Sequence, residues 1–141
     1  MPVKNFANSK NVYKALAKKL DLSVGEIVEN LGVEAYKNVT ALTPVDTGYA
    51  RASWNISQVS PDESIEDKKK FSGEGIQIAK AVNNRKLSSF TYDINSSPAV
   101  FVTNNVPYIV ELENGHSEQS KYMVRRTLHA LRRKYIKILK L

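Results

Sequence analysis

Residues 94–126 read INSSPAVFVTNNVPYIVELENGHSEQSKYMVRR, and the rest of the chain is organised around this stretch. An apolar run over residues 99–103, bounded by Ser-Ser-Pro and Asn-Asn, is short enough to predict a buried strand rather than a helix. Pro107 suits the first turn of a helix, where its missing N–H costs nothing. Residues 108–114 then predict a short helix, and Gly115 is placed for a left-handed C-cap.

A long C-terminal helix is predicted over about residues 122–139, after a polar loop at 116–120. Apolar residues recur along it in steps of three and four and predict one buried face: Val124, Leu128, Leu131, Tyr135 and Ile138. Residues 121–141 hold eight Lys and Arg and no acid, a charge of +8; the whole chain carries +7, so residues 1–120 sum to −1. The protein is therefore a nearly neutral domain with one basic helix.

A second long helix is predicted over about residues 23–42. Ser23 can cap its start, and Glu26 completes a capping box. An apolar stripe follows at helical spacing: Val24, Val28, Leu31, Ala35, Val39 and Leu42. Pro44 ends this helix, because the residue before a proline is pushed toward extended geometry. Gly32 is unfavourable inside a helix and indicates a close contact.

The remaining segments are shorter. Residues 10–20 have helical apolar spacing, and 46–48 predict a turn. Alternation over 52–58 predicts a half-buried strand with Trp54 and Ile56 on one face.

Downstream of this strand, residues 60–72 lack apolar periodicity and predict a mobile loop. A helix is favoured over a strand for residues 73–90, and 91–95 predict one further strand. The fold class expected is α+β: a small, mainly antiparallel sheet covered by the two long helices.

Composition limits the kind of protein this can be. A chain of 141 residues predicts a single domain, with residues 1–22 as an N-terminal helical extension. There is no cysteine, which excludes disulfides and thiolate metal sites. No apolar run approaches the length of a membrane span, and the N-terminus lacks the apolar core of a signal peptide.

No group of residues predicts catalysis. His116 and Ser117 are neighbours in sequence, which does not bring their side chains together, and no Gly-x-Ser-x-Gly turn is present. His116 and His129 have no carboxylate at metal-ligand spacing. We therefore expect a protein that is not an enzyme and that binds no metal or cofactor.

Two blocks of sequence resemble the signature of the small neck proteins of tailed bacteriophages, also called head–tail joining or tail-completion proteins. The first block is Pro-Val-Asp-Thr-Gly at residues 44–48, followed by Arg51 and Ser53. The second block consists of nine residues: Asn104, Asn105, Tyr108, Glu113, Gly115, Ser117, Gln119, Met123 and Thr127. The family often has Ala-Pro after the glutamine, where this chain has Ser120-Lys121. The resemblance covers roughly residues 24–131.

The resemblance implies a structural virion protein of the neck. It would join the DNA-filled head to the tail as part of a stacked ring connector, by binding rather than turnover. Its partners would be copies of itself, neighbouring connector, stopper or tail-terminator rings, and DNA close by in the lumen, without a membrane. Assembly would take place in the host bacterial cytoplasm. One alternative is a tail terminator that caps the tail tube, and a second is a basic nucleic-acid-binding protein, which no recognised motif supports.

Nine residues are candidates for protein contacts: Arg51, Glu113, His116, Ser117, Glu118, Gln119, Arg132, Arg133 and Lys137. Arg51 could pair with a partner's carboxylate or be a solvated charge at the end of a strand. The loop over 113–120 could carry recognition or be a plain connector. The basic helix could meet an acidic protein face, DNA or solvent, and its apolar seam favours the protein face.

Overall fold

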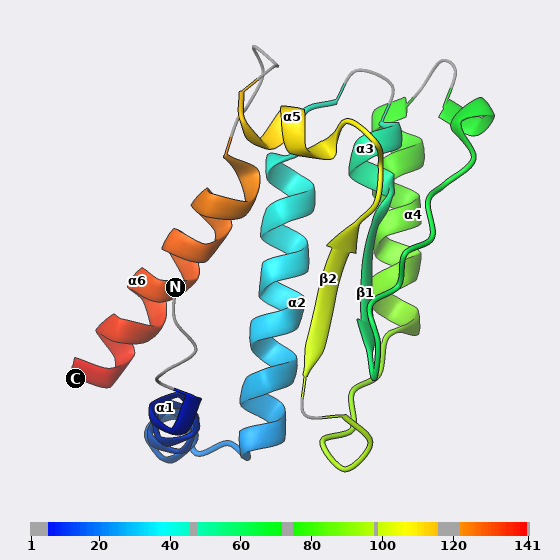
Figure 1. The fold of residues 1–141 in the computed structure, drawn as a ribbon. Helices are drawn as coiled ribbons and strands as arrows, with labels where there is room; N and C mark the ends of the chain where they lie inside the picture. The colour runs from blue at the N-terminus through cyan, green and yellow to red at the C-terminus, as the bar shows by residue number, and fades with distance from the viewer. Residues whose placement is uncertain (1–5, 46–47, 72–74, 98, 116–121, 141) are drawn as a thin grey trace.

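The computed structural model describes residues 6–45, 48–71, 75–97, 99–115 and 122–140, and Figure 1 shows their arrangement. In chain order the elements are α1 (Phe6–Leu20), α2 (Val24–Leu42), α3 (Tyr49–Ala52), β1 (Trp54–Gln58), the short 3-10 helix η2 (Lys68–Phe71), α4 (Gly75–Ser89), β2 (Val100–Asn104), α5 (Ile109–Glu113) and α6 (Met123–Lys140). The fold is α+β, as predicted. No described helix is both long and apolar enough to cross a membrane.

Helix α2 is the central element and lies between the sheet and α6 (Figure 1). It begins as predicted, because the Ser23 hydroxyl accepts a hydrogen bond from the Glu26 N–H at 3.1 Å. It ends at Thr43, whose backbone is extended before Pro44. A Cβ added at Gly32 would lie 2.5 Å from the Val100 side chain, so this glycine lets β2 approach the helix closely, as predicted.

The two strands pair antiparallel, with Trp54 opposite Asn104 and Gln58 opposite Val100. The strand predicted at residues 99–103 is β2, displaced by one residue. Its burial was overestimated: every β2 residue is half-buried, because the sheet has two strands and α2 and α4 cover one face. Residues 91–95 are not a strand; the Asp93 carboxylate accepts the Asn95 N–H at 2.9 Å and closes a turn.

Strand β1 is shorter than the predicted 52–58 because residues 49–52 form the helical turn α3. The helix favoured over 73–90 is confirmed as α4, and the N-terminal helix as α1. Under the sheet, Tyr36 is fully buried; its hydroxyl donates to the Trp54 carbonyl at 3.1 Å and accepts from Asn83 at 3.0 Å. Burial raises the pKa of Tyr36 to about 12, so this hydroxyl stays protonated.

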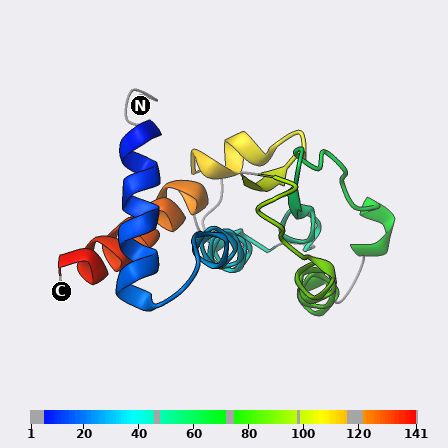
Figure 2. The same ribbon diagram turned by 90° about the horizontal axis from the view of Figure 1, so that it is seen from below.

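The predicted buried face of α6 is confirmed in the C-terminal half of the helix, where Leu131, Tyr135 and Ile138 pack inward, and is wrong in the N-terminal half. The residues that face inward are Met123, Thr127, Leu131 and Tyr135, whereas Val124 and Leu128 are 37% and 55% exposed. Both sets have helical spacing, but Met123 packs beside Tyr36 under the sheet and fixes the rotation of the helix. Toward its C-terminal end α6 packs against α1, which crosses it (Figure 2).

Candidate functional site

The two motif blocks meet at one end of the molecule, where the end of α2 and α3 contact the end of β2, α5 and the start of α6. We call this region the junction. The Asn104 amide donates to the Ala50 carbonyl at 2.8 Å, although the two residues are 54 positions apart. The Trp54 indole N–H donates to the Thr43 hydroxyl at 2.7 Å, and that hydroxyl lies 3.4 Å from the Met123 sulfur. Two motif residues of the second block, Asn104 and Met123, therefore contact residues that lie within or next to the first block, Ala50 and Thr43.

Arg51 closes the C-terminal end of α2. Its guanidinium donates to the Thr43 carbonyl at 3.2 and 2.9 Å and to the Ala41 carbonyl at 3.1 Å. Carbonyls in the last turn of a helix lack partners within the helix, so a nearby cation stabilises them. Burial lowers the pKa of Arg51, and the half-buried guanidinium stays charged at neutral pH. Arg51 is thus not a solvated strand-end charge, and its pairing with a partner's carboxylate stays a prediction.

Glu113 caps the start of α6. Its carboxylate accepts from the Val124 N–H at 2.8 Å and from the Arg125 N–H and side chain, both at 3.2 Å. A carboxylate at a helix N-terminus satisfies unpaired N–H groups and complements the helix dipole. The Glu113 carbonyl also accepts the Tyr122 N–H at 2.9 Å. This bond holds the end of α5 beside the start of α6.

The left-handed C-cap predicted at Gly115 is confirmed by its φ of 97°. Four candidate residues of the polar loop lie outside the described residues: His116, Ser117, Glu118 and Gln119. Their contacts with a partner stay predictions.

The basic face of α6 combines two cations that pair with carboxylates of the chain, Arg125 and Lys134, with several other exposed ones. Lys134 and the Tyr135 hydroxyl both bond to the carboxylate of Glu34 on α2. Burial raises the pKa of Glu34, but these two hydrogen bonds outweigh it and the net pKa is lowered. The candidates Arg132, Arg133 and Lys137 are exposed, so they are available to a partner.

A groove of about 560 Å³ runs between α2 and the first turns of α6, and we call it the α2–α6 groove. Its lining is Asn38, Ala41, Leu42, Tyr122, Arg125, Arg126, Thr127, His129 and Ala130. The Thr127 hydroxyl is buried and has no hydrogen-bond partner among the described residues. Sequence reasoning missed this groove because it assigned the buried face of α6 to the stripe that starts at Val124.

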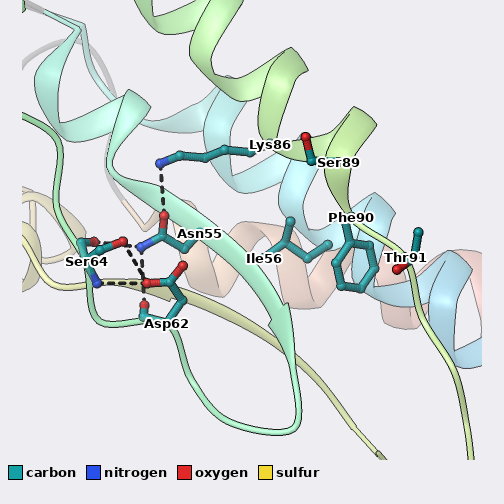
Figure 3. A pocket seen from close by; sticks show the side chains of 8 residues that line it. All are labelled: Asn55, Ile56, Asp62, Ser64, Lys86, Ser89, Phe90 and Thr91. Atoms are coloured by element: carbon teal, nitrogen blue, oxygen red, sulfur yellow. Dashed lines mark hydrogen bonds between the residues drawn. The ribbon is translucent and has the colours of Figure 1, made fainter. Parts of the chain in front are cut away.

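A second hollow, of about 340 Å³, lies beside Lys86 on the other side of the sheet (Figure 3). The Lys86 ammonium donates to the Ala52 and Trp54 carbonyls at 2.7 and 3.1 Å and to the Asn55 amide oxygen at 2.9 Å. Glu66 forms an ion pair with it at 3.2 Å. Burial lowers the pKa of Lys86 and Glu66 opposes that shift.

An ammonium group has three N–H donors, and Lys86 uses them to bind α4 to β1. Its geometry is that of a structural contact rather than of a nucleophile. No group of three His, Cys, Asp or Glu side chains within metal-binding reach occurs in the described part of the chain. The absence of enzyme activity stays a prediction.

The segment 62–67, Asp-Glu-Ser-Ile-Glu-Asp, runs along the outer face of the sheet, and we call it the acidic ledge. Its backbone is tied to the sheet: the Asn55 amide donates to the Asp62 and Ser64 carbonyls at 3.2 and 2.7 Å, and the Thr103 hydroxyl to the Asp62 carbonyl at 2.6 Å. The loop predicted over 60–72 then ends in η2, where Phe71 is buried. Its mobility stays a prediction.

Comparison with known proteins gives no match: no family model, no curated protein and no solved structure resembles this chain at a significant level. Its function must be inferred from its own residues.

Proposed function

We propose that this protein is a structural component of the bacteriophage neck, a subunit of one of the stacked rings that join the DNA-filled head to the tail. The observation that carries the proposal is the junction. The two blocks that resemble the neck-protein signature are separate in sequence, yet Asn104 bonds to Ala50 and Met123 lies against Thr43. Residues that build one shared structural feature are what a family signature requires, whereas two chance matches have no reason to be in contact.

Several motif positions also have a physical reason for their residue type. Asn104 supplies a donor to Ala50 and an acceptor for the Val106 N–H at 3.0 Å. Glu113 supplies the carboxylate at the start of α6, and Gly115 the positive φ that side chains disfavour. These roles support a common fold, and they leave the exposed surfaces of α6 and the ledge for assembly.

The mechanism would be binding by repeated surfaces. A ring needs each subunit to present two different complementary patches, one to each neighbour. A tail terminator would use the same principle at another level of the particle. Binding of DNA is favoured only by the exposed cations of α6, and two further α6 cations, Arg125 and Lys134, already pair with carboxylates inside the chain. A protein face therefore remains the better partner for this helix.

The direct test is head–tail joining in a cell extract that lacks the protein. We expect DNA-filled heads and free tails to accumulate unjoined, and purified protein to restore joined particles. Joined particles at the normal yield without the protein would refute the proposal.

The basic face is tested in the same extract with the triple variant R132Q/R133Q/K137Q. A matched control is K68Q/K69Q/K70Q, which removes three exposed cations outside α6. Joining should fail for the α6 variant alone, with unchanged DNA binding at every salt concentration. Loss of joining together with a weaker salt dependence of DNA binding would assign the face to phosphate contacts instead. Normal joining would remove any role for these cations.

A further inference from the structure

We propose that the α2–α6 groove of one copy receives the acidic ledge of the next copy, with Ile65 seated in the groove. This contact deepens the proposed ring assembly and rests on it. It assigns the two different surfaces that a head-to-tail contact between identical subunits requires.

The groove combines an apolar interior with a cationic rim. Leu42 and the exposed Ala41 and Ala130 supply apolar lining, and Arg125 and Arg126 stand at its edge. The Arg125 side chain is 58% exposed even though it contacts Glu113, so it can still reach a second carboxylate. A site of this kind fits an apolar side chain that is flanked by acids.

The Thr127 hydroxyl adds an independent indication that the groove is incomplete in the isolated chain. Thr127 is 4% exposed, and its hydroxyl lacks a hydrogen-bond partner among the described residues. A buried polar atom without a partner is costly, and a docked peptide segment carries N–H and C=O groups that can satisfy it after a small side-chain movement.

The acidic ledge has the complementary chemistry. Ile65 is 46% exposed, and four carboxylates lie within three positions of it: Asp62, Glu63, Glu66 and Asp67. Of these, Glu66 is engaged by Lys86, Asp62 accepts hydrogen bonds from the Ser64 N–H and hydroxyl at 2.9 and 2.7 Å, and Asp67 accepts one from the Lys69 N–H at 3.1 Å, each through one oxygen. Lys68, Lys69 and Lys70 follow the ledge directly, so the contact depends on where the carboxylates lie rather than on the net charge of the segment.

Hydrogen bonds also tie the ledge to the sheet and its ends at several points. Besides the bonds to Asp62 and Ser64, the Glu66 N–H donates to the Ser53 hydroxyl at 3.3 Å, and the Asn105 amide to the Glu63 carbonyl at 3.4 Å. A segment fixed in advance loses little conformational entropy on binding, which favours association. Exposed Ile65 on a hydrogen-bonded backbone is thus suited to be an anchor.

The groove and the ledge lie on opposite sides of the molecule. In Figures 1 and 2, α6 and α1 form one side, and the segment that leads from β1 to η2 lies at the other, beyond the sheet. The ledge cannot fill the groove of its own chain. Contact between the two surfaces is therefore intermolecular and repeats from copy to copy, which closes a ring when the rotation between copies allows it.

The test uses two variants that each disable one surface and touch no hydrogen bond. Ala130→Glu fills the groove with a bulky acid, and Ile65→Lys puts a cation on the ledge. Matched controls on α4 are Ala81→Glu and Ile76→Lys, which change exposed residues of the same types. Sedimentation at low salt and up to millimolar concentration gives the mass of each species.

We expect the wild type and both controls to associate beyond the 15.8 kDa monomer. Each variant alone should stay monomeric. Their mixture should form a heterodimer and nothing larger, because one intact groove and one intact ledge remain. Association of either variant like the wild type, a mixture that stays monomeric, or a monomeric wild type would each overturn the inference. If the wild type is monomeric and Ala130→Glu loses DNA binding, the groove is assigned to DNA instead.

The two proposals fail separately. If the protein is required for head–tail joining but the variants associate normally, the groove contact is wrong and the neck function stands. If the heterodimer forms as expected but joining does not need the protein, the neck function is wrong and the contact stands.

Discussion

The N-terminal half of α2 is held mainly by apolar packing, whereas its C-terminal end combines apolar packing with hydrogen bonds from side chains. At the first end, Leu16 of α1, Ile27 of α2 and Tyr135 of α6 form one buried cluster. At the second end, the junction, Arg51 and Trp54 bond to Thr43, and Asn104 bonds to Ala50. The same helix is thus stabilised mainly by burial at one end, and by burial together with directed polar contacts at the other.

This difference indicates what each end does. Apolar packing is not directional, so the N-terminal half of α2 can tolerate other side chains of similar volume. The junction depends on particular donors and acceptors, and losing one leaves a buried group without its partner. The junction, which carries both motif blocks, therefore tolerates fewer substitutions. It also positions the start of α6, which forms one wall of the α2–α6 groove.

The largest effect is expected from Trp54→Ala at the junction. Trp54 is 5% exposed, so the change should lower the free energy of unfolding by about 3–5 kcal/mol, the range for large aromatic side chains. Trp54→Phe keeps much of the ring but loses the N–H bond to Thr43, and should cost less. Urea denaturation measures both. A cost for Trp54→Ala below about 1 kcal/mol would show that this residue is not part of the core.

Ile27→Ala should have the next largest effect, and it tests the apolar packing in the N-terminal half of α2. Ile27 is 1% exposed, and we expect a loss of about 2–4 kcal/mol from the lost burial and the cavity. Ile27→Val should cost about 1 kcal/mol, because it removes one methylene group. Thermal and urea unfolding measure both changes. An equal loss in the free energy of unfolding for the two would contradict the claim that the volume of the buried side chain determines stability at this end.

Asn104→Ala tests the polar contacts of the junction without a large change in volume. It removes the donor to Ala50 and the acceptor for Val106, and should cost about 1–3 kcal/mol. The adjacent Asn105 is a matched control: it is exposed, and its hydrogen bond to the Glu63 carbonyl is long at 3.4 Å. Asn105→Ala should change stability by less than about 0.5 kcal/mol. Similar costs at both asparagines would argue against a special role for the junction.

Glu34→Gln should have the smallest effect, about 1 kcal/mol at neutral pH, through the weakened contact with Lys134. The folded protein lowers the pKa of Glu34 below its ordinary value of 4.5, so the carboxylate contributes stability above that value. This contribution is lost as the pH falls through the lower pKa of the folded state. The stability difference between wild type and variant should therefore shrink with acidification below about pH 4.5. A difference that stays constant to low pH would contradict the ionic contact.

Apolar spacing and capping residues were sufficient to predict where α2 begins and ends. The Ser23 cap and the glycine after α5, Gly115, act within a few residues, and both are confirmed. The stripe from Val24 to Leu42 predicts the helix itself, but of its members only Val39 is buried, and the most buried apolar residues of α2 are Ile27 and Tyr36. The turn α3 was missed because Tyr49–Ala52 is about one helical turn, too short to show a helical period in its apolar residues. The rotation of α6 was missed because Met123 was treated only as the start of the helix, although its burial beside Tyr36 decides which face points inward.

The candidate site was less predictable, for a physical reason. Arg51 and Glu113 were identified as polar residues of interest, but the helix ends that they bond are set by tertiary contacts. Residue spacing carries no information on which distant carbonyl a guanidinium will reach. The groove and the acidic ledge arise in the same way, from how α6 lies on α2 and how residues 62–66 lie on the sheet.

The head-to-tail contact between copies can be measured most directly by cross-linking, because the chain has no cysteine of its own. The double variant Ile65→Cys/Ala130→Cys places one thiol on the ledge and one in the groove. Under mild oxidation the account predicts a ladder of disulfide-linked oligomers that ends at one closed size and disappears on reduction. Ile65→Cys/Ala81→Cys, whose second thiol lies outside the groove, should give no such ladder. Equal cross-linking in the two double variants, or none in either, would contradict the account.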